Sequence, residues 1–195
     1  MQISEVISPA TRADWRAWLF AHHESSTEIW VERFHLRSGK PSITYDELVE
    51  ECLCFGWIDG IMKKWSPESS VQRTTPRRAK SFLSELNRQR IWKLREANLM
   101  TAAGEAAVEG RVGEPDDPFE IPDWIERELR RDKEVRSRFE ALPRLYRRLR
   151  VGYITEADRP NRRPEAENRL ANLIRKTKAG KRYGTEPLRG ILYEK

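Results

Sequence analysis

Residues 44–60, TYDELVEECLCFGWIDG, predict a helix followed at once by a strand pair. Thr44 and Glu47 have the spacing of a capping box, in which each side chain satisfies a backbone N–H of the first turn. Apolar side chains from Tyr45 to Leu53 then recur at helical spacing, and Gly56 is suited to end the helix. The dipeptide Asp59-Gly60 predicts a type I′ turn between two short antiparallel strands. A helix beside a hairpin predicts an α+β fold.

The sequence on either side of this stretch extends the mixed pattern. Thr11 and Asp14 begin a second expected helix, and the β-branched and aromatic residues of segment 28–35 predict a strand. A strand after the hairpin is expected at residues 71–74, and helices at residues 82–97 and 101–109. We therefore expect an N-terminal mixed part, with a small antiparallel sheet packed by helices.

The second part of the chain shows only helical spacing. Its apolar residues predict helices after Pro122, around Val135 and Phe139, after Pro143, and around Leu170 and Leu173, the last ending near Gly180. The segment between the two parts is rich in Pro, Gly and acidic residues, which is typical of a linker. The expected division is residues 1–112 for the mixed part, 113–122 for the connector, 123–180 for a basic helical module and 181–195 for a basic tail.

Composition narrows the classes of protein. Of 195 residues 35% are charged, and no apolar run is long enough to span a membrane, so no transmembrane segment is expected. The N-terminus lacks the pattern of a secretory signal, and two cysteines only two positions apart cannot form a disulfide framework. These features predict a cytoplasmic location. The net charge is −3 over residues 1–122 and +9 over residues 123–195.

A group of basic residues follows the expected hairpin and is the first candidate site. Guanidinium groups can bind phosphate or carboxylate oxygens in pairs, so this cluster favours a small anionic, phosphate-bearing ligand. Trp57 would add a stacking face and Gln72 a hydrogen bond. The expected ligand-binding residues are Trp57, Asp59, Gln72, Arg73, Arg77 and Arg78.

Each of these residues also has an ordinary structural explanation. Asp59 is either a turn residue or the general base of an uncharacterised small-molecule enzyme, Trp57 either packs in the core or stacks on a ligand, and the arginines form either a site or a solvated turn. We assign no catalytic residue and expect a binding protein rather than an enzyme. No cofactor or metal is expected, because no Cys or His pair follows Cys52 and Cys54 at ligand spacing.

The basic helical module supports a second hypothesis, a regulator that binds nucleic acid. Arg144, Arg147 and Arg148 recur along one expected helix and would contact phosphates. The alternative is a polar helix face whose arginines pair with glutamates. The sequence has no zinc finger or RNA-binding signature, and it leaves the ligand and the oligomeric state open.

Residues 54–60, CFGWIDG, and residues 72–78, QRTTPRR, resemble the family called YdeI or OmpD-associated, or bacteriocin protection. Leu142-Pro143, residues 146–148 and Arg159-Pro160 are similar to its helical C-terminal module. The chain departs from the family at Leu83, where an aromatic residue is common, and at residues 161–167. The resemblance implies resistance to antimicrobial peptides, and we expect a non-enzymatic cytoplasmic binding or stress-protection protein. Some members of the family are described as periplasmic. Because we expect no secretory signal, we do not transfer that location to this chain.

Overall fold

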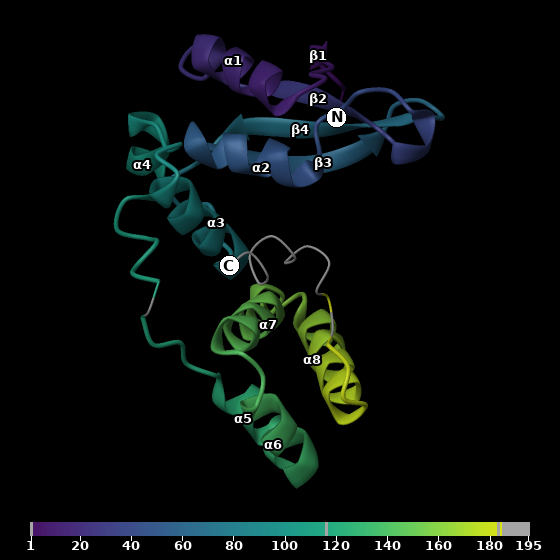
Figure 1. The fold of residues 1–195 in the computed structure, drawn as a ribbon, viewed down its shortest axis with the longest axis vertical. Coiled ribbons are helices and arrows are strands. Elements are labelled where there is room, and N and C mark those ends of the chain that lie inside the picture. The colour runs from purple at the N-terminus through teal and green to yellow at the C-terminus, as the bar shows by residue number, and fades with distance from the viewer. Residues whose placement is uncertain (1, 116, 183, 185–195) are drawn as a thin grey trace. The chain divides into compact units, whose positions relative to one another are not determined.

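The computed structural model describes residues 2–115, 117–182 and 184. The chain divides into two compact units (Figure 1). The N-terminal unit comprises the described residues of segments 1–82 and 90–112, and the C-terminal unit those of segments 83–89 and 113–195. Helix α3, Glu85–Glu96, contributes to both units. The expected division at residues 113–122 stays a prediction, and residues 185–195 of the expected tail lie outside the described residues.

A four-stranded sheet forms the centre of the N-terminal unit, which confirms the α+β class. The strands are β1 (Val6–Ile7), β2 (Ile29–Phe34), β3 (Trp57–Lys64) and β4 (Ser69–Pro76), in the order β1-β2-β4-β3. The pairs β2–β4 and β3–β4 are antiparallel, whereas β1 pairs parallel to β2. Strand β1 was not expected, because a strand of two residues is too short to leave a periodic pattern. Its parallel pairing means that the sheet is not the purely antiparallel one that we expected.

The expected turn at Asp59-Gly60 is wrong, because both residues lie inside β3. The hairpin closes instead at residues 65–68, where the Trp65 N–H donates to the Ser69 carbonyl over 3.1 Å. Gly60 does not have the positive φ that a type I′ turn requires. The register with β4 shifts between Asp59 and Met62, and glycine inside a strand often marks such a bulge.

The capping boxes predict the helix starts correctly. Helix α1 (Arg12–His22) is capped by Thr11 and Asp14, and α2 (Tyr45–Cys54) by Thr44 and Glu47, with both reciprocal hydrogen bonds present in each case. The remaining helical segments of this unit are a 3-10 turn at Leu36–Ser38, the second half of α3, and α4 (Ala102–Val108). Helix α3 begins at Glu85, three residues later than expected.

Helix α4 docks on the C-terminal end of α2 through a close backbone approach. The Thr101 hydroxyl, at the N-cap of α4, donates to the Cys54 carbonyl over 2.6 Å. A Cβ on Gly104 would lie 2.1 Å from the same carbonyl oxygen. Only glycine therefore fits at this contact.

Large aromatic side chains fill the core between the helices and the sheet. The Trp15 indole N–H donates to the Leu48 carbonyl over 3.2 Å, which ties α1 to α2. Trp18 stacks on Trp15 and meets Trp57 edge-on, with ring centroids 5.4 and 5.8 Å apart. These contacts fix both helices over one face of the sheet.

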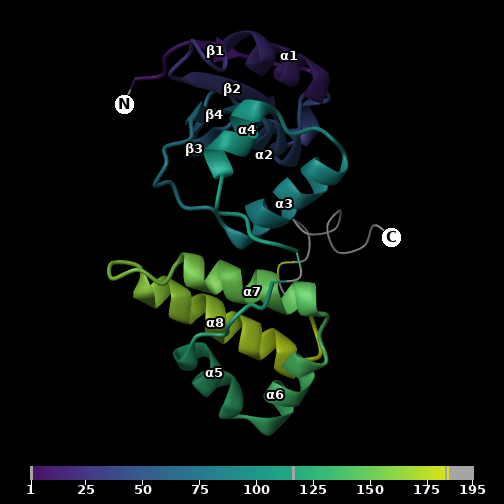
Figure 2. The ribbon, with the colours of Figure 1, turned by 90° about the vertical axis from the view of Figure 1, so that its left-hand side faces the viewer.

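The C-terminal unit contains four expected helices: α5 (Asp123–Arg130), α6 (Lys133–Glu140), α7 (Arg144–Glu156) and α8 (Arg163–Lys178). Helices α7 and α8 run side by side (Figure 2), and α6 packs on α8. The core includes Ile125, Leu129, Phe139, Ile154 and Leu173. The helical spacing of the sequence therefore identified this unit correctly.

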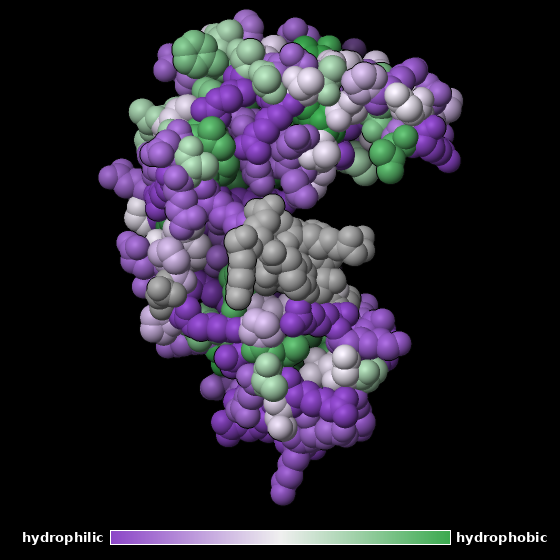
Figure 3. All heavy atoms as spheres, viewed as in Figure 1, coloured by the Kyte–Doolittle hydropathy of each residue, from purple (hydrophilic) through white to green (hydrophobic). Residues whose placement is uncertain are grey.

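Hydrophilic residues cover most of the face drawn in Figure 3, as a composition with 35% charged residues leads one to expect. Within the described ranges, none of the helices combines the length and the apolar character needed to cross a membrane.

Candidate anion site in the N-terminal unit

The predicted site residues lie on both faces of the sheet and do not form one cluster. Alternate strand residues face opposite sides. Arg73 pairs in register with Trp30, and Gln72 pairs with Val31. Arg73 therefore lies on the face opposite to Gln72, where its Nε donates to Glu28 Oε2 over 2.5 Å. The Arg73 guanidinium is therefore already paired with the Glu28 carboxylate.

Trp57 and Gln72 are both buried among protein atoms. Trp57 is 1% exposed, and its indole N–H donates to the His23 carbonyl over 3.2 Å. The Gln72 side-chain amide donates to the Gly60 carbonyl over 2.6 Å, inside the bulge. The structure thus places Trp57 in the core and Gln72 in a sheet contact.

Asp59 faces α2 and is held by Tyr45. The Tyr45 hydroxyl, from the first turn of α2, donates to Asp59 Oδ2 over 2.7 Å. The Arg33 guanidinium lies 5.2 Å from the centre of the Tyr45 ring. Burial, and then the nearby Asp59 carboxylate, raises the pKa of Tyr45, so its hydroxyl stays protonated. The side chains of Asp59, Tyr45 and Arg33 thus come together from β3, α2 and β2.

Arg77 follows directly after β4 and is only 9% exposed. One terminal nitrogen donates to the Phe82 carbonyl over 3.2 Å, but its Nε is buried without a hydrogen-bond partner among the described residues. Burial, and then the neighbouring Arg111, lowers the pKa of Arg77, while the Asp59 charge partly offsets this. The Arg77 cation is therefore incompletely compensated.

Arg33 is partly buried, and one of its terminal nitrogens donates to the Met62 sulfur over 3.7 Å. Burial lowers the pKa of Arg33, and the nearby Tyr45 and Asp59 only partly oppose this shift. The Arg33 Nε is also buried and has no hydrogen-bond partner in the described part of the chain. Asp59 is thus the acidic group that both arginines share.

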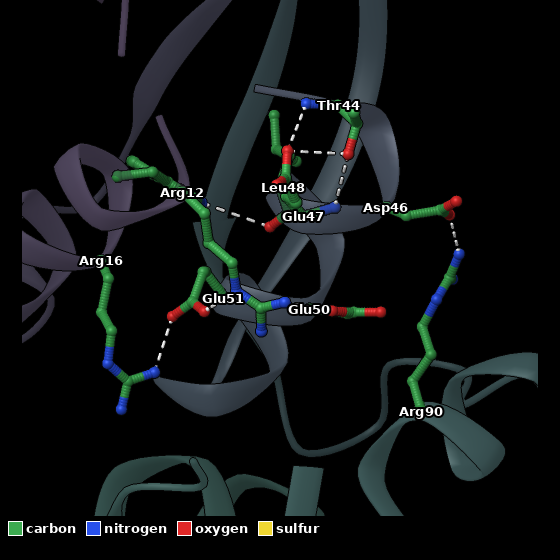
Figure 4. Close-up of polar contacts among 10 residues, drawn as sticks. Arg12, Arg16, Thr44, Asp46, Glu47, Leu48, Glu50, Glu51 and Arg90 are labelled. Atoms are coloured by element: carbon green, nitrogen blue, oxygen red, sulfur yellow. Dashed lines mark hydrogen bonds and ion pairs between the residues drawn. The ribbon is translucent and has the colours of Figure 1, made fainter. Parts of the chain in front are cut away.

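Two more arginines contribute positive charge around this site. Arg111 donates to the Ser81 carbonyl, and Arg90 donates to the Asp46 carboxylate at the start of α2 (Figure 4). The cluster, which we call the Arg77 site, has four cations and two carboxylates. Its members are Arg33, Arg77, Arg90, Arg111, Tyr45, Asp46 and Asp59.

A buried carboxylate on α2 has complete charge partners and serves as a comparison within the same unit. Glu51 has a side chain only 1% exposed and accepts from Arg12 Nε over 2.6 Å and from Arg16 over 2.7 Å (Figure 4). Arg12 also reaches Glu50 over 2.6 Å. Both oxygens of Glu51 have a cationic partner, whereas the Nε atoms of Arg33 and Arg77 have no hydrogen-bond partner among the described residues.

Other reactive groups are held in neutral forms. Burial raises the pKa of both cysteine thiols, well above its usual range for Cys52 and to about 11 for Cys54. Neither thiol supplies a thiolate nucleophile at neutral pH. Among the residues that the structure describes, no three His, Cys, Asp or Glu side chains gather as a metal site.

The sequence predicted two members of this site, Asp59 and Arg77. It did not predict the other five, which are Arg33, Tyr45, Asp46, Arg90 and Arg111. One available signal was the position of Arg33, which shares the strand parity of the buried Ile29 and Val31 and so faces inward. Arg78, which was expected to belong to the site, is exposed, and its backbone N–H donates to the Ser81 hydroxyl.

The arginines of the nucleic-acid hypothesis differ in their surroundings. Arg148 is 5% exposed, and its Nε donates to Glu85 over 2.5 Å. Arg147 is partly buried, whereas Arg144 is exposed and donates to the Asp117 carbonyl over 2.8 Å. The three do not form one exposed stripe.

Two family models match the chain. Residues 7–107, more than half of the chain, match a family described as a domain of unknown function, DUF8412. The chain belongs to this family. Residues 118–180 match the family described as "Bacteriocin-protection, YdeI or OmpD-Associated", which confirms the suspected resemblance over the helical module. No curated protein matches the chain, and no solved structure does.

The two matched segments separate the candidate anion site from the helices of the C-terminal unit. The Arg77 site lies almost entirely in the segment of the first match, with Arg111 just beyond it. The four helices of the C-terminal unit lie in the segment of the second. The CFGWIDG motif, which first suggested the bacteriocin-protection family, falls in the first segment.

Proposed function

We propose that this chain is a non-enzymatic stress-protection protein whose N-terminal unit binds a small phosphate-bearing anion at the Arg77 site. The coarse link to protection rests on the bacteriocin-protection family, whose model matches residues 118–180. The anion is our inference from the electrostatics of the N-terminal unit.

One observation carries the proposal: Arg77 is a buried cation without a full complement of partners. Its Nε has no partner in the described ranges, and burial lowers its pKa. Removing a charge from water costs several kcal/mol unless nearby charges and hydrogen bonds compensate. An incoming anion would supply both, and its binding free energy would include relief of that cost.

Arg33 would provide the second contact and Asp59 would set the geometry. A phosphate group has several acceptor oxygens and suits two guanidinium groups better than one. Asp59 lowers the cost of the two cations without neutralising them, and Tyr45 holds its carboxylate in place. The protonated thiols and tyrosine favour binding over nucleophilic chemistry.

The experiment is a thermal-shift titration with inorganic phosphate and pyrophosphate, compared with chloride at matched ionic strength. A ligand at 100 times its dissociation constant stabilises by about 2.7 kcal/mol. We expect phosphate compounds to raise the melting temperature of the wild type, and Arg77→Met and Arg33→Met to lose that rise.

Arg37→Met is the matched control, because Arg37 is an exposed arginine of the same unit. It should respond to phosphate like the wild type. An equal loss in all three variants would indicate general charge screening. No effect of phosphate on the wild type, or full retention in Arg77→Met, would refute the site.

A further inference from the structure

The C-terminal unit contains a groove of about 490 Å³ between α5 and α8. Pockets of roughly 300–1,000 Å³ bind small molecules. Helix α5 lines it with Trp124, Arg127 and Glu128, which share one helix face. The sequence patterns did not predict a groove between these two helices.

The floor of the groove is aliphatic and comes from α8. Leu170 is buried and Ile174 is packed against the core of the unit, so the floor is supported from below. Ala171 is exposed between them, and its small side chain leaves the groove open. An alkyl chain on this floor would be removed from water.

Trp124 forms a fixed wall. Its indole N–H donates to Asp158 Oδ2 over 2.9 Å, and the Arg163 guanidinium lies 3.9 Å from its ring centre. Because both contacts hold the ring, the wall needs no rearrangement to accept a ligand.

One cation on the rim, Arg127, has no carboxylate partner among the described residues. Arg131 pairs with Glu128 over 2.7 Å, and Arg163 pairs with Asp158 over 2.6 Å and with Glu167 over 3.2 Å. The exposed Arg127 side chain makes no hydrogen bond or ion pair with any described residue. Glu128 and Glu167 each have an arginine partner, whereas the Arg127 guanidinium is unpaired beside an aliphatic floor.

We propose that this groove binds a small amphipathic carboxylate, with its alkyl chain on Leu170, Ala171 and Ile174 and its carboxylate on Arg127. A guanidinium fork matches the two oxygens of a carboxylate. The aliphatic floor favours an alkyl body over a fully polar anion. This inference is independent of the Arg77 site, which lies in the other unit.

Isothermal titration calorimetry of the full chain with decanoate tests the proposal, with all probes kept below their critical micelle concentrations. We expect one decanoate per chain. Arg127→Gln should weaken binding at least tenfold, and Ala171→Trp should abolish it by filling the groove. Arg130→Gln is the control, because Arg130 is an exposed arginine of the same helix outside the groove and pairs with Glu126.

Decyltrimethylammonium has a similar alkyl chain with the opposite charge and should bind at least tenfold more weakly than decanoate. Circular dichroism confirms that each variant is folded. The proposal is overturned if decanoate gives no binding, or if Arg130→Gln weakens it as much as Arg127→Gln. Binding by Ala171→Trp equal to that of the wild type, or equal affinity for the ammonium probe, also overturns it.

Discussion

The substitution Glu51→Gln removes the most deeply buried charge that ties α1 to α2. Its carboxylate is 1% exposed, whereas its partners Arg12 and Arg16 are 31% and 33% exposed. Removing one partner of a buried ion pair costs about 3–5 kcal/mol. Because both arginines can turn toward water, we expect the low end, about 3 kcal/mol of unfolding free energy. Urea unfolding followed by tryptophan fluorescence measures it.

Glu50→Gln is the matched control on the next residue of the same helix. Glu50 is 27% exposed and has a single contact, with Arg12. Partly exposed pairs of this kind contribute roughly 0–1 kcal/mol. If Glu51→Gln costs no more than Glu50→Gln, the two arginines do not depend on Glu51 and the reasoning fails.

Three further outcomes are expected. Thr44→Ala should cost about 1 kcal/mol through loss of the α2 cap, while an unchanged urea midpoint would show that the cap is not needed. Gly104→Ala should cost about 1–3 kcal/mol or more, because its Cβ would meet the Cys54 carbonyl; wild-type stability would show that α4 shifts freely. The Ser4 hydroxyl and then Arg73 lower the pKa of Glu28. The contribution of Glu28 to folding stability is therefore present above about pH 4.3 and is lost as the pH falls through the lowered pKa. Arg73→Gln should raise the pKa of Glu28 in an NMR titration, and an unmoved titration would contradict the ion pair.

Local signals predicted most of the secondary structure. Both capping boxes place a polar side chain three residues from its partner, so helix starts at Arg12 and Tyr45 are encoded within one turn. The helices of the C-terminal unit follow from apolar residues at helical spacing, because each helix packs one stripe against a common core. The β-branched and aromatic content of residues 28–35 located β2, and the strand expected at residues 71–74 lies within β4.

The failed turn at Asp59-Gly60 shows the limit of such signals. The dipeptide suits a tight turn and also a bulge, and local energetics do not choose between them. The pairing of β3 with β4 on both sides of the bulge makes that choice, and it turns Asp59 toward Tyr45. For this reason the residues around Asp59 in the structure differ from those that the sequence predicted.

The sequence by itself determined the α+β class, the helix caps, the helical C-terminal unit and the basic character of the residues after β4. Tertiary structure alone decided which arginines are exposed, which are paired and which are buried without full compensation. Arg73, Arg77 and Arg78 are near neighbours in sequence, yet the first pairs with Glu28, the second is buried and the third faces water. The physical reason is that burial and pairing depend on long-range contacts, which no local pattern of residues specifies.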